Sequence, residues 1–199
     1  ELFPWSKVAT PPLLNVKLGS SLPIKVALFV NSKEIITNKI QGNESFTIYK
    51  DELPCIKFNE DISDWDTSSC ENFKSTFAGT KEFNQPIGKW DISKAKEISF
   101  MLMNCIKFNQ DLSDWKFGQY LDKTTSLFNG CISFEGNGLD KWVMPKFISD
   151  CSKMFAKCEN LKEENIKNLD FSNASFTRDM FKETKISTAV INKILNIKD

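Results

Sequence analysis

Acidic residues recur at fixed spacing, and pairs of them are the groups in this chain that could do chemistry. The recurring positions are Asp61 and Asp111, Asp64 and Asp114, and Asp66 and Asp91. Two carboxylates held close together can act as general acid and general base, or can bind calcium through their oxygens. One hypothesis is therefore a carbohydrate-active protein that uses Asp61 and Asp111. The alternatives are a partner-binding surface and a solvent-exposed face on which charges compensate one another.

The sequence favours the solvent-exposed face. Pro86 takes the position that Asp61 holds one period earlier, and Lys89 falls between Asp64 and Asp114. An alternation of acid and base balances charge, whereas a catalytic pair needs two carboxylates at neighbouring positions. The chain also contains no His, which excludes Ser-His-Asp and Cys-His catalysis and His-ligated zinc. We expect no enzymatic activity, no cofactor and no metal.

Charge and hydropathy narrow the class of partner. Lys and Arg number 26, Asp and Glu also number 26, and the formal net charge is zero. A neutral chain offers no general electrostatic attraction for nucleic acid or an anionic membrane. The sequence has no apolar run of about 18 residues, so we expect no direct insertion into a membrane. The expected partner is a protein or another cell-surface macromolecule.

An internal repeat of about 25 residues positions these side chains. Its first copy runs Phe58-Asn59-Glu60-Asp61-Ile62-Ser63-Asp64-Trp65-Asp66, and the next two copies begin 25 and 50 residues later. Repetition at a fixed period indicates a repeat architecture, in which each unit buries its apolar side against its neighbours. The copies share three apolar columns: Phe58, Phe83, Phe108, Phe134 and Leu161; Ile62, Ile87, Leu112, Leu139 and Ile166; and Trp65, Trp90, Trp115, Trp142 and Leu169.

The two halves of each copy predict different elements. Apolar residues in the second half are spaced by three, four and three, as in Ile148, Cys151, Phe155 and Cys158, which predicts one face of a short helix. The first half, with β-prone residues and a Trp, predicts a short strand. The expected fold is an α/β repeat solenoid, a leucine-rich-repeat-like stack of about five strand-plus-helical-turn coils over residues 55–185. The predicted structural core is Phe58, Trp65, Phe83, Trp90, Phe108, Trp115, Phe134 and Trp142.

The cysteines fall into the same columns. Cys105, Cys131 and Cys158 share one column with Thr80 and Thr184. At such positions a free Cys behaves as a small apolar residue, so we expect buried thiols. Disulfides across coils and a metal cluster remain the alternatives, although bridging needs a specific geometry and the chain contains no Cys-x-x-Cys pair.

The repeat pattern points to a family. The pattern Phe-Asn-x-Asp-Ile/Leu-Ser-x-Trp-Asp, together with the segment Met154-Phe155-Ala156-Lys157-Cys158, resembles the mycoplasma surface-lipoprotein repeat of unknown function. That repeat is grouped with the BspA-type leucine-rich repeats of bacteria, protists and some large DNA viruses. The resemblance covers about residues 55–185 and is strongest in the first three copies. It implies a solenoid, often at a cell surface and linked with adhesion, and no catalytic residues. The chain departs from it by lacking the lipoprotein Cys at residue 1.

The flanks do not repeat. Residues 1–54 predict a small antiparallel β meander, which either caps the stack or is the end of an upstream domain. Residues 186–199 predict a C-terminal capping helix with Ser187 as N-cap and Val190, Ile191, Ile194 and Leu195 on one face.

The functional expectation is a non-catalytic protein-interaction or adhesion module at the cell surface or outside the cell. The predicted partner-binding residues lie on the strand face and adjacent loops: Glu60, Ser63, Asp64, Gln85, Lys89, Gln110, Ser113, Asp114 and Lys141. The alternative is a structural component of a larger assembly, such as a virion or a surface layer.

Overall fold

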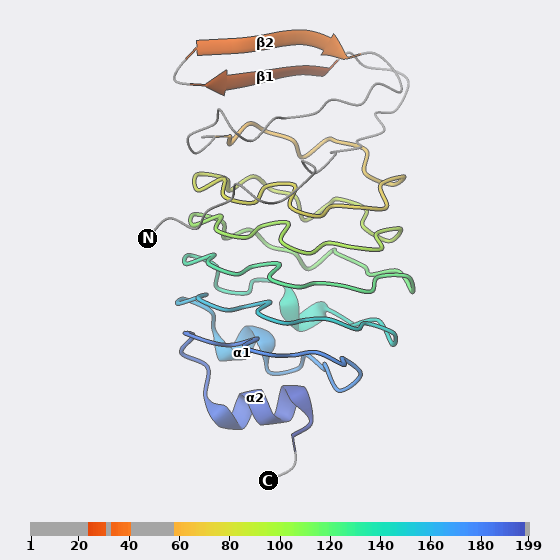
Figure 1. Ribbon diagram of the computed structural model, residues 1–199, viewed down its shortest axis with the longest axis vertical. Helices are drawn as coiled ribbons and strands as arrows, with labels where there is room; N and C mark the ends of the chain where they lie inside the picture. Colours follow the sequence, from red (N-terminus) through yellow and green to blue (C-terminus); the bar gives the residue numbers. More distant parts are fainter. Residues whose placement is uncertain (1–23, 31–32, 41–57, 198–199) are drawn as a thin grey trace, which may run out of the picture.

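The computed structural model describes residues 24–30, 33–40 and 58–197, and Cys55 lies outside these ranges. From Phe58 onward the chain winds through coils that are stacked along the long axis of the molecule (Figure 1). We number them by the Phe column of the repeat: coil 1 (58–82), coil 2 (83–107), coil 3 (108–133), coil 4 (134–160) and coil 5 (161–186). The stack leads into helix α2 (Thr188–Leu195).

The prediction of an α/β repeat solenoid is wrong. In the described part of the chain, the strands are β1 (Ile24–Val30) and β2 (Lys33–Ile40), and the helices besides α2 are α1 (Glu163–Ile166) and the 3-10 helix η2 (Leu139–Lys141). The coils themselves are built from tight turns, so the leucine-rich-repeat-like unit of strand plus helical turn is absent from them. Strand-like pairing between coils is limited to one residue in each, in a column formed by Asn72, Glu97, Lys123, Asp150 and Phe176.

Left-handed residues explain why the second half of each coil is not helical. Ser75 has φ of 58° and Gly79 has φ of 81°, and each is the third residue of a turn. These turns are closed by hydrogen bonds from the Thr76 N–H to the Phe73 carbonyl (3.3 Å) and from the Thr80 N–H to the Phe77 carbonyl (3.0 Å). A left-handed third residue is the mark of a type II turn, and it interrupts a right-handed helix. The equivalent left-handed residues in coils 2 to 5 are Phe100, Asn104, Ser126, Gly130, Lys153, Lys157, Asp179 and Glu183.

The remaining N–H groups of each second half bond to the next coil. From coil 1, the N–H groups of Phe73, Ser75, Phe77 and Gly79 donate to the carbonyls of Glu97, Ser99, Met101 and Met103 at 2.7–2.9 Å. The same pattern of four hydrogen bonds joins coil 2 to 3, coil 3 to 4 and coil 4 to 5. Hydrogen bonds between coils therefore satisfy these backbone N–H and carbonyl groups. The side chains at three-four-three spacing turn inward although the segment has none of the i to i−4 hydrogen bonds of a helix.

The core follows the apolar columns. Phe83, Phe108 and Phe134 are fully buried, whereas Phe58 and Trp65 of coil 1 are half-buried. Each buried Trp also donates its indole N–H to a carbonyl of the preceding coil, as Trp115 does to Ile87 at 2.9 Å. The equivalent bonds run from Trp90 to Ile62 at 3.1 Å and from Trp142 to Leu112 at 2.9 Å. A buried indole needs such a partner, so the Trp column fixes the spacing between coils.

The described cysteines are buried. The thiols of Cys105, Cys131 and Cys158 donate to the carbonyls of Phe77, Leu102 and Phe128, each in the preceding coil, at 2.9–3.1 Å. Burial raises the pKa of Cys105 and of Cys151 to about 12. A thiol in this state is a packing group and a weak donor, with little thiolate for chemistry at neutral pH.

The flanks are described in part. β1 and β2 form a two-stranded antiparallel sheet in which Ile24 lies opposite Ile40, and the rest of the predicted meander of residues 1–54 lies outside the described residues. At the other end, α2 buries Ile194 completely against the core. Ser187 is at the N-cap position of α2, where its side chain makes no capping hydrogen bond, and Asn196 ends the helix with φ of 53°.

Candidate interaction surface

The recurring aspartates close turns. Asp61, Asp66, Asp91 and Asp111 each accept a hydrogen bond, at 2.8–3.0 Å, from the backbone N–H of the Ser two residues later. This is the Asx turn, in which a side chain replaces a backbone acceptor. The hydrogen bonds from Ser63 lower the pKa of Asp61, and those from Ser68 lower the pKa of Asp66. In the part of the chain that the structure describes, no three acidic or Cys side chains are grouped to hold a metal ion.

Two of the predicted partner-binding residues belong to a polar ladder that joins neighbouring coils. The side-chain amides of Gln85 and Gln110 donate to the backbone carbonyls of Asn59 and Asn84, at 2.6 and 2.9 Å. The side chains of the Asn column make parallel bonds. Asn59 accepts a hydrogen bond from the backbone N–H of Asn84, and Asn84 accepts one from the backbone N–H of Asn109. Gln85 and Gln110 therefore join coils and are half-buried.

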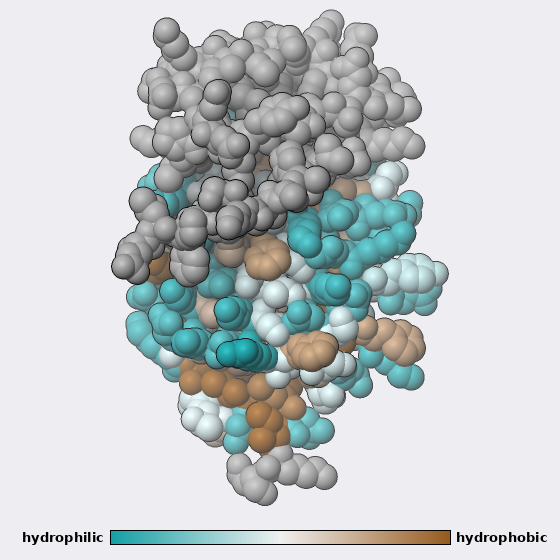
Figure 2. Space-filling model, in the orientation of Figure 1, coloured by the Kyte–Doolittle hydropathy of each residue, from teal (hydrophilic) through white to brown (hydrophobic). Residues whose placement is uncertain are grey.

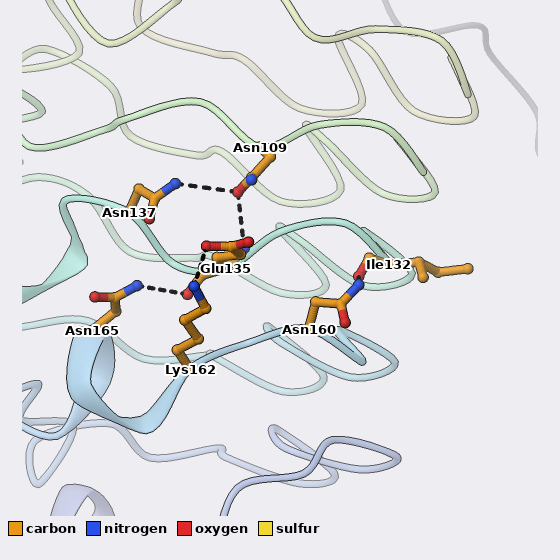
Figure 3. Close-up of polar contacts among 7 residues, drawn as sticks. All are labelled: Asn109, Ile132, Glu135, Asn137, Asn160, Lys162 and Asn165. Atoms are coloured by element: carbon orange, nitrogen blue, oxygen red, sulfur yellow. Dashed lines mark hydrogen bonds and ion pairs between the residues drawn. The ribbon is translucent and has the colours of Figure 1, made fainter.

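Coil 4 continues this ladder with different residues (Figure 3). The Asn109 side-chain oxygen accepts from the Glu135 backbone N–H at 3.0 Å and from the Asn137 amide at 3.3 Å. Asn165 in turn donates to the Glu135 carbonyl at 2.9 Å, while the Glu135 carboxylate pairs with Lys162. The ladder thus survives where Asn is replaced by Glu.

The other predicted partner-binding residues are at the surface without forming one site. Ser63 and Ser113 are half-buried and their N–H groups close the Asx turns described above. Lys141 pairs with Asp140 at 2.8 Å, and it is the member of the set that lines a pocket. The exposed members are Glu60, Asp64, Lys89, Asp114 and Lys141.

Coils 3 and 4 differ from the others at the corner that follows the Trp column. Four residues lie between Trp65 and Cys70, whereas five lie between Trp115 and Leu121 and five between Trp142 and Ile148. We call the two enlarged segments, residues 116–120 and 143–147, the inserted corner. Two adjacent coils carry it, so the extra residues lie one above the other in the stack.

The inserted corner carries a different type of residue at its first position, directly after the Trp column. In coils 1, 2 and 5 the first corner residue is Asp66, Asp91 or Asp170, and each closes an Asx turn with a Ser two residues later. In coils 3 and 4 the same position holds Lys116 and Val143. A row of acidic turns is therefore interrupted by a basic and an apolar residue at two neighbouring coils.

The backbone of the inserted corner packs closely on the preceding coil, and its large side chains divide between the core and the surface. A Cβ atom on Gly118 would lie 1.8 Å from the Ser93 carbonyl oxygen, so the coil 3 backbone rests directly on coil 2. The Phe117 ring turns inward and meets the Trp142 ring edge-on, with centroids 4.7 Å apart. The exposed large hydrophobic side chains are Tyr120, Val143 and Phe147, at 66, 82 and 72 %.

An open pocket of about 340 Å³ lies between the two segments of the inserted corner. Trp115, Phe117 and Met144 contribute apolar surface to it, and Lys116, Lys141 and Lys146 contribute positive charge. Elsewhere, on the face drawn in Figure 2, apolar residues interrupt a mostly hydrophilic surface and gather at the C-terminal end over α2. The inserted corner and its pocket thus combine exposed aromatic rings, a hollow and three lysines.

The comparison with protein families covers most of the stack. Residues 53–142 and 119–196 match the family described as Mycoplasma protein of unknown function, DUF285. The chain belongs to this family. No curated protein and no solved structure matches it. Because the function of the family is unknown, the role of the inserted corner rests on its own chemistry.

Proposed function

We propose that this chain is a non-catalytic binding module that contacts a protein or another cell-surface macromolecule through the inserted corner. Its place of action would be the cell surface or the extracellular space, with a virion as the alternative. The grouping of the repeat with BspA-type repeats is also a proposal, which the shared columns of Phe, Ile and Trp support at the level of sequence. The described helices are too short and too polar to cross a membrane.

The inserted corner is the observation that carries this proposal. Large apolar side chains that stand exposed together on a folded domain mark interaction sites more often than scattered ones do. Aromatic residues dominate the binding energy of interfaces because they bury much area with few rotatable bonds. Tyr120 and Phe147 occupy equivalent positions on coils 3 and 4, one residue before Leu121 and Ile148.

Charge indicates the partner's chemistry. Lys116, Lys141 and Lys146 line the pocket, while the corresponding corners of coils 1, 2 and 5 carry aspartates. A partner that presents an apolar side chain flanked by carboxylates would complement the inserted corner and be repelled by the acidic corners. Lys141 already forms an ion pair with Asp140, whereas Lys116 donates to the neutral Ser113 carbonyl and Lys146 lies over the Phe147 ring. Lys116 and Lys146 are therefore the better candidates for contacts with a carboxylate of the ligand.

Selection from a random peptide display library tests the proposal. We expect the selected peptides to contain aromatic residues with neighbouring Asp or Glu. The double variant Tyr120→Ser/Phe147→Ser should bind them at least tenfold more weakly, with an unchanged melting temperature because both side chains are exposed. The control is Asp64→Ser/Lys89→Ser, which changes the face predicted from sequence and should bind normally. Loss of binding only in the control would move the site to that face; absence of any specific peptide would contradict a binding role.

A further inference from the structure

The last coil ends in a row of backbone donors without acceptors. The N–H groups of Thr177, Asp179, Phe181 and Glu183 occupy the positions whose equivalents in coils 1 to 4 donate to the following coil. Within the part of the chain that the structure describes, none of these four groups has a hydrogen-bond acceptor. An unpaired row of main-chain donors is a template for another chain, as at the edge of a β-sheet.

Helix α2 does not complete this row. It lies beyond coil 5 at the C-terminal end of the stack (Figure 1). The Ile194 carbonyl accepts from the Phe171 N–H at 3.0 Å, and the Ser187 N–H donates to the Glu163 carboxylate at 2.5 Å. Glu163 and Phe171 both precede the second half of coil 5. The helix thus covers the end of the core and supplies no acceptor to Thr177, Asp179 or Glu183.

The residue that precedes the first donor of the row is polar or charged in coils 1 to 4 and apolar in coil 5. The column of single-residue bridges holds Asn72, Glu97, Lys123 and Asp150, and then Phe176 in coil 5. Natural proteins protect open edges with charged side chains. Here the charged or polar residue of the inner coils is replaced by a Phe that is 63 % exposed, directly before the first unpaired donor. An apolar contact and a donor row therefore coincide at one end of the molecule.

The shape of the row selects its partner. Asp179 and Glu183 are left-handed, with φ of 57° and 58°, so the donors follow the turn path of the repeat. At each inner junction such a path pairs with a second path of the same shape, which an extended peptide would not match. The first described coil offers the complementary acceptors: the carbonyls of Lys74, Thr76 and Ala78 accept no hydrogen bond from any described residue, whereas their coil 2 equivalents accept from coil 1.

We propose that the C-terminal edge of coil 5, formed by Phe176 and the four unpaired donors, binds the first coil of a second copy of this chain. The contact repeats the main-chain pairing of the inner junctions along this edge, with hydrogen bonds to the Lys74, Thr76 and Ala78 carbonyls and the Phe176 ring packed on the neighbour. It joins two different surfaces at opposite ends of the stack, so each added copy continues along the long axis (Figure 1), and a linear polymer grows as concentration rises. This interface is separate from the inserted corner and gives the assembly role a specific contact.

Amide hydrogen exchange on the full chain tests the donor row directly. In dilute samples, Thr177, Asp179, Phe181 and Glu183 should exchange much faster than Cys151, Lys153, Phe155 and Lys157, whose N–H groups are bonded to coil 5. In concentrated samples the first four should become at least tenfold more protected, while sedimentation velocity shows species growing in steps of one chain. Exchange that does not change with concentration, or a monomer throughout, would overturn the proposal.

Two matched variants assign the contact. Phe176→Lys restores a charge to the bridge column, and its side chain is exposed, so the fold should be kept; we expect at least tenfold weaker association. Phe147→Lys changes a Phe of similar exposure at the inserted corner and should leave association unchanged while weakening peptide binding. Association that persists in Phe176→Lys refutes this interface, and association lost only in Phe147→Lys assigns it to the inserted corner.

Discussion

The corner after the Trp column exists in two forms in the same molecule. In coils 1 and 2 it is short, closed by Asp66 or Asp91 through an Asx turn, and presents small polar side chains. In coils 3 and 4 it is one residue longer, and it presents Tyr120 and Phe147 beside lysines. The columns beneath both forms are the same, so the stack tolerates a change of surface at a corner without a change of core. A repeat of this kind separates the residues that hold it together from those free to acquire a ligand.

The largest expected effect tests whether the core beneath the inserted corner is as tightly packed as the rest. Trp115 is 1 % exposed, and Trp115→Ala should lower the free energy of unfolding by about 3–5 kcal/mol, as other large truncations in cores do. Trp65→Ala, at the half-buried end of the same column, is the control and should lower it less. Urea denaturation measures both; equal losses would mean that coil 3 is no better packed than coil 1.

The next prediction concerns the backbone contact that supports the inserted corner. In Gly118→Ala the new Cβ would lie 1.8 Å from the Ser93 carbonyl oxygen, so coil 2 and coil 3 must move apart at this point. We expect a loss of about 1–3 kcal/mol, the usual range for overpacking, together with weaker peptide binding. Gly79→Ala is the control: its Cβ meets nothing within 4 Å, and its left-handed backbone should lead to a smaller loss.

The acidic corners should make stability depend on pH, whereas the inserted corner should not. Hydrogen bonds from Ser68 and Ser93 hold the pKa of Asp66 and of Asp91 below the usual 3.8. A carboxyl group whose pKa is lower in the folded state stabilises the protein above its unfolded pKa, and this contribution is lost as pH falls through the folded pKa. Asp66→Asn/Asp91→Asn should therefore flatten the melting temperature between about pH 4 and pH 2. Lys116→Gln, which changes the inserted corner, is the control: its melting temperature should fall with pH as steeply as that of the unchanged protein.

The smallest expected signal is thiol reactivity in the folded protein. Burial raises the pKa of Cys105 and of Cys151 to about 12, so at pH 8 less than about one thiol in a thousand is ionised. We expect negligible labelling of both by iodoacetamide under native conditions and full labelling in guanidinium, measured by mass spectrometry. Rapid native labelling of either residue would show that the coils open locally.

The sequence predicted which residues turn inward but not how the backbone does it. Spacing alone placed Phe155 and Cys158 on one face, and both are fully buried. A helix and a row of type II turns share that spacing, and non-glycine residues such as Ser75 and Lys153 adopt φ of 58° and 57° without a mark in their residue type. The Gly79, Asn104 and Gly130 column was the available sign, because Gly and Asn are the residues that most readily become left-handed.

The candidate site was harder to predict. Gln85 and Gln110 were expected to bind a partner because amides are polar, yet each joins its coil to the preceding one. Polarity does not separate a solvated side chain from one that satisfies a neighbouring backbone. The inserted corner left a trace in the sequence, namely the change in spacing after Trp115 and Trp142. The change in spacing does not show which side chains of the segment are exposed: Phe117 packs on Trp142, whereas Tyr120 and Phe147 stand in solvent.

The direction of the bonds between coils gives the molecule an electrical polarity. In the second halves of coils 1 to 4, four N–H groups point toward the next coil and the carbonyls that receive them point back. Aligned peptide dipoles add along their common axis, as they do in an α-helix. In a helix the bare N–H groups lie at the N-terminal end, whereas along this wall of the stack they lie at the C-terminal end. Partial positive charge therefore accumulates where the chain leaves its last coil.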